Sequence, residues 1–380
     1  MSYPDCDVAH TEDGPLAGLT FSVKDMFDVA GFPTSAGSPT MLAVSGIKTK
    51  TARAVQQLLD AGARFIGKAV TDEFAFSVIG NNAHFGVPVN GAAPDRYAGG
   101  SSSGSASSVS CGLCDFSLGT DSGGSIRGPA SQCGLPSFGR ISLEGCFGLC
   151  PPFDTAGILA ADLDVFERAT SVLIGKDSQH SKETPRLLIP EDIFELFGPR
   201  VINAVSDALE SAQSLWGQAH RVKAAPVDLN DVLKAYQALQ GREIWKHDGP
   251  FIEKYQPTFG PGVKERFAFA KTIHDKDLTE QESLCEQAVR HINGLLADSS
   301  VLILPTLPGA GLKLDCSPDD MNAFRSRMSA SFCLGGLAGV PWITLPLAEI
   351  DGAPLGVSLV SACGTDAWLL ELSKALVQNR

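Results

Sequence analysis

The stretch from Gly99 to Ala130, GGSSSGSASSVSCGLCDFSLGTDSGGSIRGPA, decides how this sequence is interpreted. Between Gly99 and Ser125 it contains ten serines and seven glycines, and it has no Lys, Arg or His between Arg96 and Arg127. A serine-rich segment of this size forms either a flexible linker or a site with a nucleophilic serine, and such a serine needs a base. The base must therefore come from another part of the chain.

The composition of the 380 residues is that of a globular α/β protein, with 44% hydrophobic residues and 39 glycines. The net charge of -13 and the pI near 5.0 argue against a nucleic-acid or anionic-membrane surface, because phosphates are bound by clustered Lys and Arg. Ten cysteines are too few for a disulfide scaffold, and residues 1–10 lack the basic and apolar regions of a signal peptide. We therefore expect a cytoplasmic protein with reduced thiols that acts on a small neutral substrate.

Strand and helix signals alternate in the N-terminal part of the chain. Residues 18–27 alternate between apolar and polar side chains, residues 51–63 form an amphipathic helical pattern that closes on a glycine, and residues 64–70 return to a strand pattern. Within the serine-rich stretch, residues 105–113 indicate a helix of small, closely packed residues. This order is typical of a βαβ unit.

Strand signals return near the C-terminus, at 301–306, 341–347 and 355–360. The signals from about 160 to 300 are mainly helical, for example VINAVSDALESAQSLWG at 201–217. Strands at both ends of the chain favour a single domain over residues 1–380. Its core would span about 15–160 and 300–370, and the helical excursion at about 160–300 would shape the substrate pocket.

Familiar nucleophile and phosphate motifs in the sequence lack the residues that their chemistry requires. A phosphate-binding P-loop needs a Lys after its second glycine, and the serine-rich stretch has none. Gly100 to Gly104 matches the G-x-S-x-G nucleophile elbow around Ser102, but serine- and glycine-rich sequence produces such matches by chance. Ser45 and Lys48 form an S-x-x-K pair without the other motifs of β-lactamases.

Metal ligation is not expected, and we predict no cofactor. Cys111 and Cys114 form C-x-x-C, but they lie at an apolar helix of small residues, which favours buried thiols over zinc. Cys146 and Cys150 are spaced C-x-x-x-C, without the four ligands in turns that zinc requires. His84 lies in a loop rich in Gly and Asn, where a structural hydrogen bond is favoured over pocket lining.

Lys24 is the remaining candidate base. It follows Phe21 and Val23, which face one side of a strand, and it lies beside Asp25 at the C-terminal strand end, where ligands bind in α/β sheets. Taken alone, such a lysine is expected to pair with a carboxylate. The alternative is that burial lowers its pKa, so that the neutral amine can take a proton from a serine.

Three segments together resemble the amidase signature family: SVKD at 22–25, GGSSSGSA at 99–106 and GTDSGGSIRGPAS at 119–131. The resemblance implies an α/β fold, a single α/β/α sandwich with a large mixed central sheet covered by helices. It also implies a catalytic triad of a lysine, a serine preceded by a cis peptide bond, and a nucleophilic serine. These match Lys24, Ser101 and Ser125.

The resemblance further implies a mechanism. Ser125 would attack an amide carbonyl, and its proton would pass through Ser101 to neutral Lys24, which would protonate the leaving ammonia. The backbone amides of the loop before and at the nucleophile would form the oxyanion hole, and the predicted donors are those of Ser122, Gly123, Gly124 and Ser125. Asp121 and Arg127 would form a buried pair that holds this loop.

Other segments look like the subgroup that contains plant indole-3-acetamide hydrolases. They are GLTFSVKDMFDVAG, NNAHFGVPVN, FGPGVKERF and VLILPTLPG. Phe76, Met26 and Thr155 resemble family positions near the acyl pocket, and they favour a hydrophobic or aromatic acyl group, with core packing as the alternative. The segment GLPSFGRISLEG after Cys133 is about four residues shorter than is usual in the family, which predicts an altered wall beside the nucleophile loop.

The expected function is that of a stand-alone amidase that hydrolyses a small neutral primary amide, such as indole-3-acetamide or another arylacetamide. The first alternative is the catalytic subunit of a glutamine-dependent amidotransferase, against which the short chain and negative charge argue. The second is a non-catalytic member of the family, against which the presence of all three catalytic residues argues. The sequence is compatible with a homodimer and predicts no nucleic-acid or membrane partner.

Overall fold

The computed structural model describes residues 7–174 and 184–379. Its strands form one mixed sheet in the order β2-β1-β3-β5-β4-β9-β10-β8-β6-β7. The strands are β1 (Thr20–Lys24), β2 (Arg64–Ala69), β3 (Phe116–Asp121), β4 (Ser137–Ile141), β5 (Thr155–Ala160), β6 (Arg186–Pro190), β7 (His220–Val222), β8 (Ser300–Pro305), β9 (Trp342–Ile350) and β10 (Ala353–Val360). This is the large mixed sheet that the sequence predicts.

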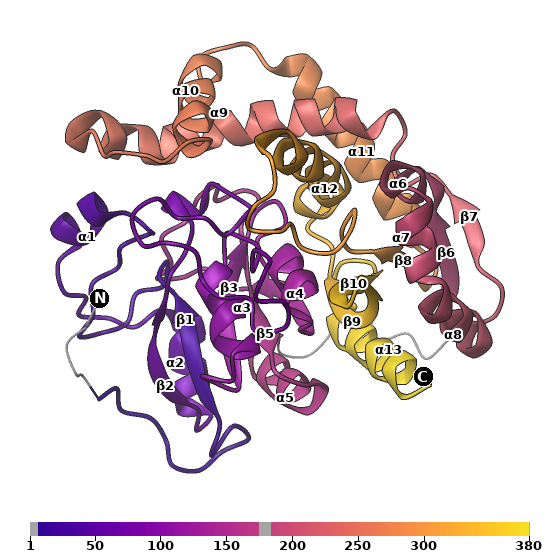
Figure 1. The fold of residues 1–380 in the computed structure, drawn as a ribbon, viewed down its shortest axis with the longest axis horizontal. Helices are drawn as coiled ribbons and strands as arrows, with labels where there is room; N and C mark the ends of the chain where they lie inside the picture. The colour runs from indigo at the N-terminus through magenta and orange to yellow at the C-terminus, as the bar shows by residue number, and fades with distance from the viewer. Residues whose placement is uncertain (1–6, 175–183, 380) are drawn as a thin grey trace.

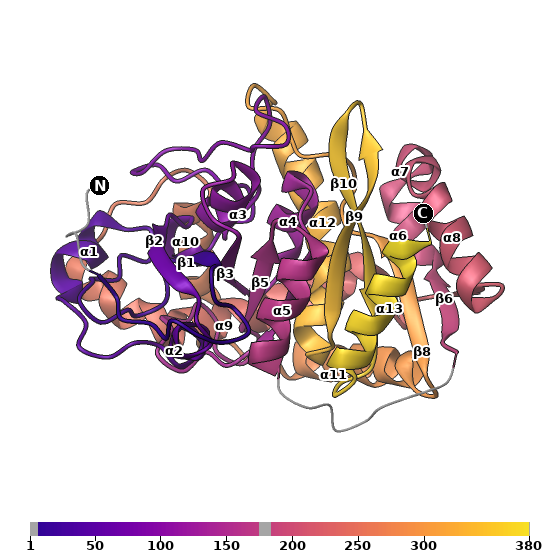
Figure 2. The same ribbon diagram turned by 90° about the horizontal axis from the view of Figure 1, so that it is seen from below.

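Helices cover the sheet on both faces. They are α1 (Pro39–Ser45), α2 (Arg53–Asp60), α3 (Ser103–Ser110), α4 (Arg127–Cys133), α5 (Leu163–Ile174), α6 (Glu191–Phe197), α7 (Pro199–Ala204), α8 (Ser206–Trp216), α9 (Leu229–Tyr255), α10 (Val263–Ile273), α11 (Thr279–Leu296), α12 (Pro318–Ala338) and α13 (Asp366–Gln378), with a 3₁₀ turn at Glu73–Ala75. Helices α9, α10 and α12 lie on one side, and α5 and α13 lie on the other (Figures 1 and 2). No helix in the described ranges is long and apolar enough to cross a membrane.

The sheet joins the two ends of the chain. Its two flanks are parallel, at β2-β1-β3 and at β8-β6-β7, and its centre is antiparallel. The central contact pairs β4 with β9, with Ser137 opposite Thr344. The N-terminal half, in indigo and magenta, therefore continues into the yellow C-terminal strands (Figure 2).

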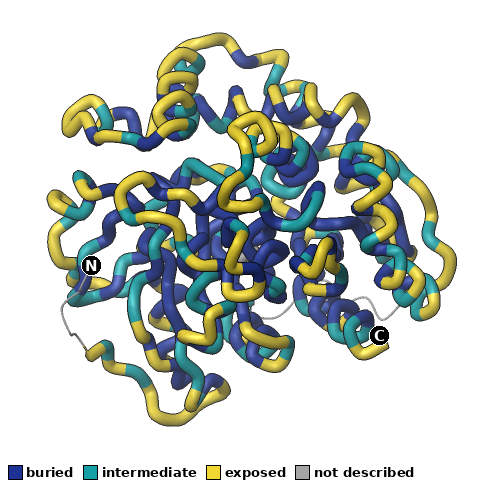
Figure 3. The backbone as a smooth tube through the Cα atoms, in the orientation of Figure 1, coloured by how far each residue is buried: buried dark blue, intermediate teal, exposed yellow. Residues whose placement is uncertain are grey.

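The core follows from the burial of the central strands. All six residues of β3 are buried, and Phe116 stacks on Phe21 of β1 with ring centroids 5.3 Å apart. The buried residues lie beneath exposed loops and outer helix faces (Figure 3), and their apolar members form one large cluster and two smaller ones. Helix α3 consists of small residues because it packs tightly: a Cβ added at Gly104 would lie 2.5 Å from the Val70 nitrogen.

The region from 160 to 300 differs from the sequence-based prediction in two details. It contains strands β6 and β7 as well as helices. The sequence did not indicate them because strands of five and three residues are too short for a clear periodic signal. The single helix expected at 201–217 is divided into α7 and α8. Val205 interrupts it, with φ −97° and ψ 3°.

Replacing Phe116 by Ala is expected to destabilise the fold by about 3–5 kcal/mol, because it removes a fully buried ring and leaves a cavity against Phe21. Urea denaturation measures the change. Leu113→Ala is the matched control, since Leu113 is 67% exposed, and it should shift the unfolding free energy by no more than about 0.5 kcal/mol. Equal effects of the two substitutions would contradict this account of the core.

Candidate active site

Lys24 is fully buried at the C-terminal end of β1. Its Nζ donates hydrogen bonds to Ser101 Oγ at 2.7 Å and to Thr120 Oγ1 at 2.7 Å. Burial lowers its pKa from 10.5 to about 8, although the charge of Asp72 acts in the opposite direction. The lysine therefore lies in the environment that the serine–lysine chemistry requires.

The ion pair that would explain Lys24 structurally is absent from the described residues. Its neighbour Asp25 instead pairs with Lys68, with Nζ and Oδ1 2.6 Å apart. No carboxylate of the described residues lies within 4.0 Å of the Lys24 Nζ. The polar contacts of Lys24 are hydroxyls and a backbone carbonyl.

The peptide bond between Gly100 and Ser101 is cis, as the resemblance implies. Ser101 is fully buried, and its carbonyl accepts hydrogen bonds from the Asp72 amide at 3.2 Å and from the Thr71 hydroxyl at 3.0 Å. The next residue, Ser102, donates its amide to the Ser125 carbonyl at 3.2 Å. The serine-rich segment is thus attached to the loop that carries Ser125.

Ser102, the centre of the chance nucleophile-elbow match, has a structural role. Its hydroxyl donates to the Thr120 carbonyl at 3.1 Å and accepts from the Thr120 amide at 3.3 Å.

His84 makes structural contacts, because its Nε2 lies 3.0 Å from the Thr258 carbonyl and 3.1 Å from Glu73. The described residues contain no cluster of His, Cys, Asp and Glu that could hold a metal ion.

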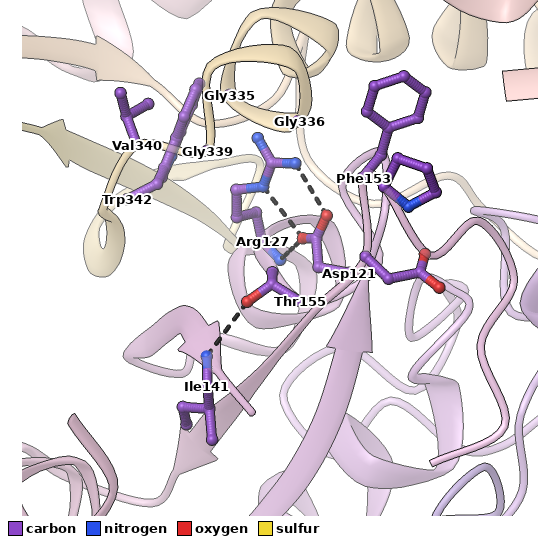
Figure 4. A pocket seen from close by; sticks show the side chains of 12 residues that line it. Asp121, Arg127, Ile141, Phe153, Thr155, Gly335, Gly336, Gly339, Val340 and Trp342 are labelled. Carbon is purple, nitrogen blue, oxygen red and sulfur yellow. Dashed lines mark hydrogen bonds and ion pairs between the residues drawn. The ribbon is translucent and has the colours of Figure 1, made fainter. Parts of the chain in front are cut away.

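Asp121 and Arg127 form the predicted buried pair. The guanidinium donates to both carboxylate oxygens, at 3.0 and 2.8 Å, as Figure 4 shows. Burial alone would raise the pKa of Asp121. The charge of Arg127 and the hydrogen bonds that the carboxylate accepts from Arg127 and from backbone amides lower this pKa to about 2. Phe332 and Trp342 cover the guanidinium at 4.4 and 4.7 Å from their ring centroids.

The predicted oxyanion hole needs a correction at Gly124. Its amide already donates to Asp121 Oδ1 at 2.6 Å, so Gly124 is not an open donor. Its role is conformational, since its φ is +117° and an added Cβ would lie 2.1 Å from the Phe332 ring. The amides of Ser122, Gly123 and Ser125 donate to no acceptor among the described residues.

Two side chains from outside the nucleophile loop hold Ser122. The Tyr236 hydroxyl, from α9, donates to the Ser122 carbonyl at 2.6 Å. The Ser122 hydroxyl donates to Asp154, whose other oxygen accepts from the amides of Leu149 and Cys150. Tyr236 lies more than 100 residues away in a helix whose motif resemblance is weak, so no local signal could identify it.

A cavity of about 340 Å³ contains Ser125. Its lining includes Ser122 and Gly123 from the nucleophile loop, Phe76, and side chains of α9, α10 and α12. The excursion at 160–300 thus shapes this cavity through α9 and α10, and α12 is an addition that the sequence did not predict.

Of the three predicted pocket residues, only Phe76 lines this cavity. Met26 is 1% exposed and packs in an apolar cluster with Phe74, so core packing, the alternative interpretation, applies to it. Thr155 lies in a second pocket beside Asp121 and Arg127, where its hydroxyl accepts from the Ile141 amide at 3.2 Å (Figure 4). The short segment after Cys133 forms β4, and none of its described residues lines the cavity with Ser125.

Replacing Arg127 by Met is expected to destabilise the protein by about 3–5 kcal/mol at neutral pH, because Asp121 would remain buried without its partner. In the wild type the low pKa of Asp121, about 2 against an ordinary value of 3.8, contributes stability that is present above pH 3.8 and is lost as the pH falls toward 2. The destabilisation by Arg127→Met should therefore be largest at neutral pH and shrink below about pH 4, as urea unfolding at several pH values measures. The double variant with Asp121→Asn should recover part of the loss, and an unchanged unfolding free energy in Arg127→Met would contradict the assignment.

Comparisons with known proteins match this chain to one family. A family model described as Amidase matches residues 3–197. Amidase 1 of Arabidopsis thaliana is 34% identical over 95% of this chain and 93% of its own length. A more distant relative, a Glutamyl-tRNA(Gln) amidotransferase subunit from Methanothermobacter thermautotrophicus, is 29% identical over 96% of this chain and 85% of its own.

The fold matches that of a solved amidase. The crystal structure of that amidase superposes with a TM-score of 0.85 at 31% identity, over 96% of this chain and 85% of the other. The family match covers the residues that supply Lys24, Ser101 and Ser125. The chain therefore belongs to the amidase family and is an enzyme that hydrolyses amide C–N bonds.

Proposed function

We propose that this amidase converts a small primary amide to a carboxylate and ammonia through an acyl-enzyme, with Lys24, Ser101 and Ser125 as its catalytic residues. The observation that carries the proposal is the 2.7 Å hydrogen bond between Lys24 Nζ and Ser101 Oγ. Of the three predicted catalytic residues, Ser125 lines the substrate cavity, so it is the serine that a substrate can reach.

Lys24 is the base in this mechanism. A pKa of about 8 leaves part of the lysine neutral near physiological pH, which an ordinary lysine would not be. When neutral, Lys24 can accept a proton from Ser101 along the same contact. The two hydrogen bonds to Thr120 fix the direction of the Nζ atom.

Acylation begins when Ser125 Oγ bonds to the carbonyl carbon of the amide. The Ser125 proton moves to Ser101, and the Ser101 proton moves to Lys24. The C–N bond then breaks, and the nitrogen takes the proton from Lys24 and leaves as ammonia. Water then bonds to the acyl carbon and gives one proton to the same relay. The ester bond to Ser125 Oγ breaks, the relay returns the proton to Ser125, and the acid leaves as a carboxylate.

The open backbone amides beside the nucleophile are suited to stabilise the oxyanion. The carbonyl oxygen gains negative charge as the tetrahedral intermediate forms, and fixed amide donors stabilise it without reorganisation. The Gly124 amide is already bonded to Asp121. The remaining donors are the amides of Ser122, Gly123 and Ser125.

The catalytic role in a glutamine-dependent amidotransferase is the alternative function, and the relative of that name supports it as a candidate. The two functions differ in whether the isolated chain turns over. A stand-alone amidase releases ammonia from a primary amide without another protein, whereas co-purifying partner proteins would favour the alternative. The cytoplasmic location and the homodimer remain predictions from the sequence.

The pH dependence of kcat/KM should report the titration of Lys24. Because burial lowers its pKa to about 8, the active neutral form is lost as the pH falls below that value. We expect kcat/KM for ammonia release to rise with pH and to level off above an apparent pKa near 8. A flat profile from pH 6 to about 9 would contradict Lys24 as the base.

Ser125→Ala and Lys24→Ala should each lower kcat by at least about 1000-fold, because both remove a member of one relay. A fluorophosphonate probe should label the wild type and leave Ser125→Ala unlabelled. Ser107→Ala is the matched control, since Ser107 is a half-buried serine of the same stretch that lies outside the cavity. Labelling that persists in Ser125→Ala would assign the nucleophile to another residue.

A further inference from the structure

The cavity that contains Ser125 carries positive charge in a protein whose net charge is -13. Arg266 from α10 and Arg325 from α12 both line it, and no Asp or Glu is among its described lining residues. Lys234 also lines the cavity, but it is exposed and pairs with Asp231 at 2.9 Å. The two arginines are thus the cationic side chains of the cavity that form no direct ion pair within the described residues.

Two contacts with Phe76 hold Arg266 in place, and neither of them is an ion pair. Its Nε donates to the Phe76 carbonyl at 2.7 Å, and its guanidinium carbon lies 5.5 Å from the centroid of the Phe76 ring. Its two terminal nitrogens donate to no acceptor among the described residues. Phe76 therefore orients the guanidinium and leaves its outer edge open for a ligand.

Arg325 is in a similar state. One terminal nitrogen donates to Asn322 Oδ1 at 3.0 Å, one turn earlier on α12. In the described part of the chain, no carboxylate lies within 4.0 Å of either guanidinium. Burial, and after it the charge of Arg325, lowers the pKa of Arg266 to about 10, while the charges of Asp72, Glu265 and Glu73 act in the opposite direction. Arg266 is therefore cationic at neutral pH. Two half-buried like charges repel each other, and an anion bound by both would relieve that repulsion.

We propose, building on the proposed function, that the acyl group of the substrate ends in a carboxylate, which Arg266 and Arg325 bind while the amide lies at Ser125. A carboxylate fits the planar donor edge of a guanidinium and forms charge-assisted hydrogen bonds with it. The cavity volume of about 340 Å³ suits a small ligand of this kind. The neutral arylacetamide expected from the sequence leaves both arginines without a partner.

The lining also separates two kinds of carboxylate-bearing amide. An amino-acid amide such as glutamine carries an ammonium group beside its carboxylate. No Asp or Glu of the described residues lines the cavity to receive that group, and two guanidiniums would repel it. The substrate class is therefore the monoamides of dicarboxylic acids.

The test compares charged and neutral amides of the same shape. Succinamate and glutaramate should be hydrolysed with a kcat/KM about 10- to 100-fold above that of succinamide and glutaramide, because a charge-assisted hydrogen bond contributes a difference of this size. Indole-3-acetamide and glutamine complete the panel. A neutral amide or glutamine that equals the monoamides would overturn the proposal.

Arg266→Gln and Arg325→Gln should each raise KM for the monoamides by a larger factor than they raise KM for the diamides of the same length. Arg325→Gln is the safer of the two, since it breaks only a bond to Asn322 on its own helix. Arg327→Gln is the matched control, because it removes a charge from α12 outside the cavity. Equal effects of Arg325→Gln on charged and neutral amides would overturn the assignment.

Binding to Ser125→Ala separates this inference from the proposed mechanism. Calorimetry should detect succinamate binding to that variant, weaker binding of succinamide, and loss of the preference when Arg325→Gln is added. Succinamate binding without turnover by the wild type would keep the carboxylate site and overturn the hydrolytic mechanism. Turnover of neutral amides without a preference for succinamate would keep the mechanism and overturn the carboxylate site.

Discussion

The buried pair of Asp121 and Arg127 is the interaction on which the nucleophile loop depends. One carboxylate accepts the amides of Gly124, Ile126 and Arg127 as well as the guanidinium. A carboxylate at 3% exposure is stable as an anion only with such compensation. Its contacts bend the chain between β3 and α4 into one conformation. Ser125, the open amides and the cavity wall all follow from that bend.

The sheet explains how a base 101 positions before the nucleophile reaches it. Strands β1 and β3 are adjacent and parallel, so Lys24 and the loop after Asp121 emerge at the same edge. The two serines that precede helix α3 connect them, because Ser101 contacts Lys24 and Ser102 contacts Ser125. Three segments far apart in sequence thus meet because parallel strands share a carboxyl edge, the usual location of ligand sites in such sheets.

The sequence predicted those parts of the fold and the site that depend on neighbouring residues, and it could not predict contacts between distant segments. The strand that ends at Lys24 and the buried pair of Asp121 and Arg127 are encoded within a few residues, and their placement agrees with expectation. Met26 lies in the core and Thr155 lies in a second pocket, and the sequence left such alternatives open because apolar or small residues near a motif can face either the core or a cavity. Arg266 and Arg325 lie on two helices that only the tertiary fold brings together.

Helix α12 contacts the nucleophile loop and its buried ion pair through Phe332 and, one turn later, through two glycines. A Cβ at Gly336 would lie 2.7 Å from the Ser122 carbonyl, and one at Gly335 would lie 2.8 Å from the Arg127 guanidinium. The same helix presents Asn322, Arg325 and Ser329 to the cavity from its earlier turns. Its two ends are therefore under separate constraints. A side chain can therefore change in the earlier turns and alter the substrate cavity, whereas any side chain at Gly335 or Gly336 would displace the catalytic loop or its ion pair.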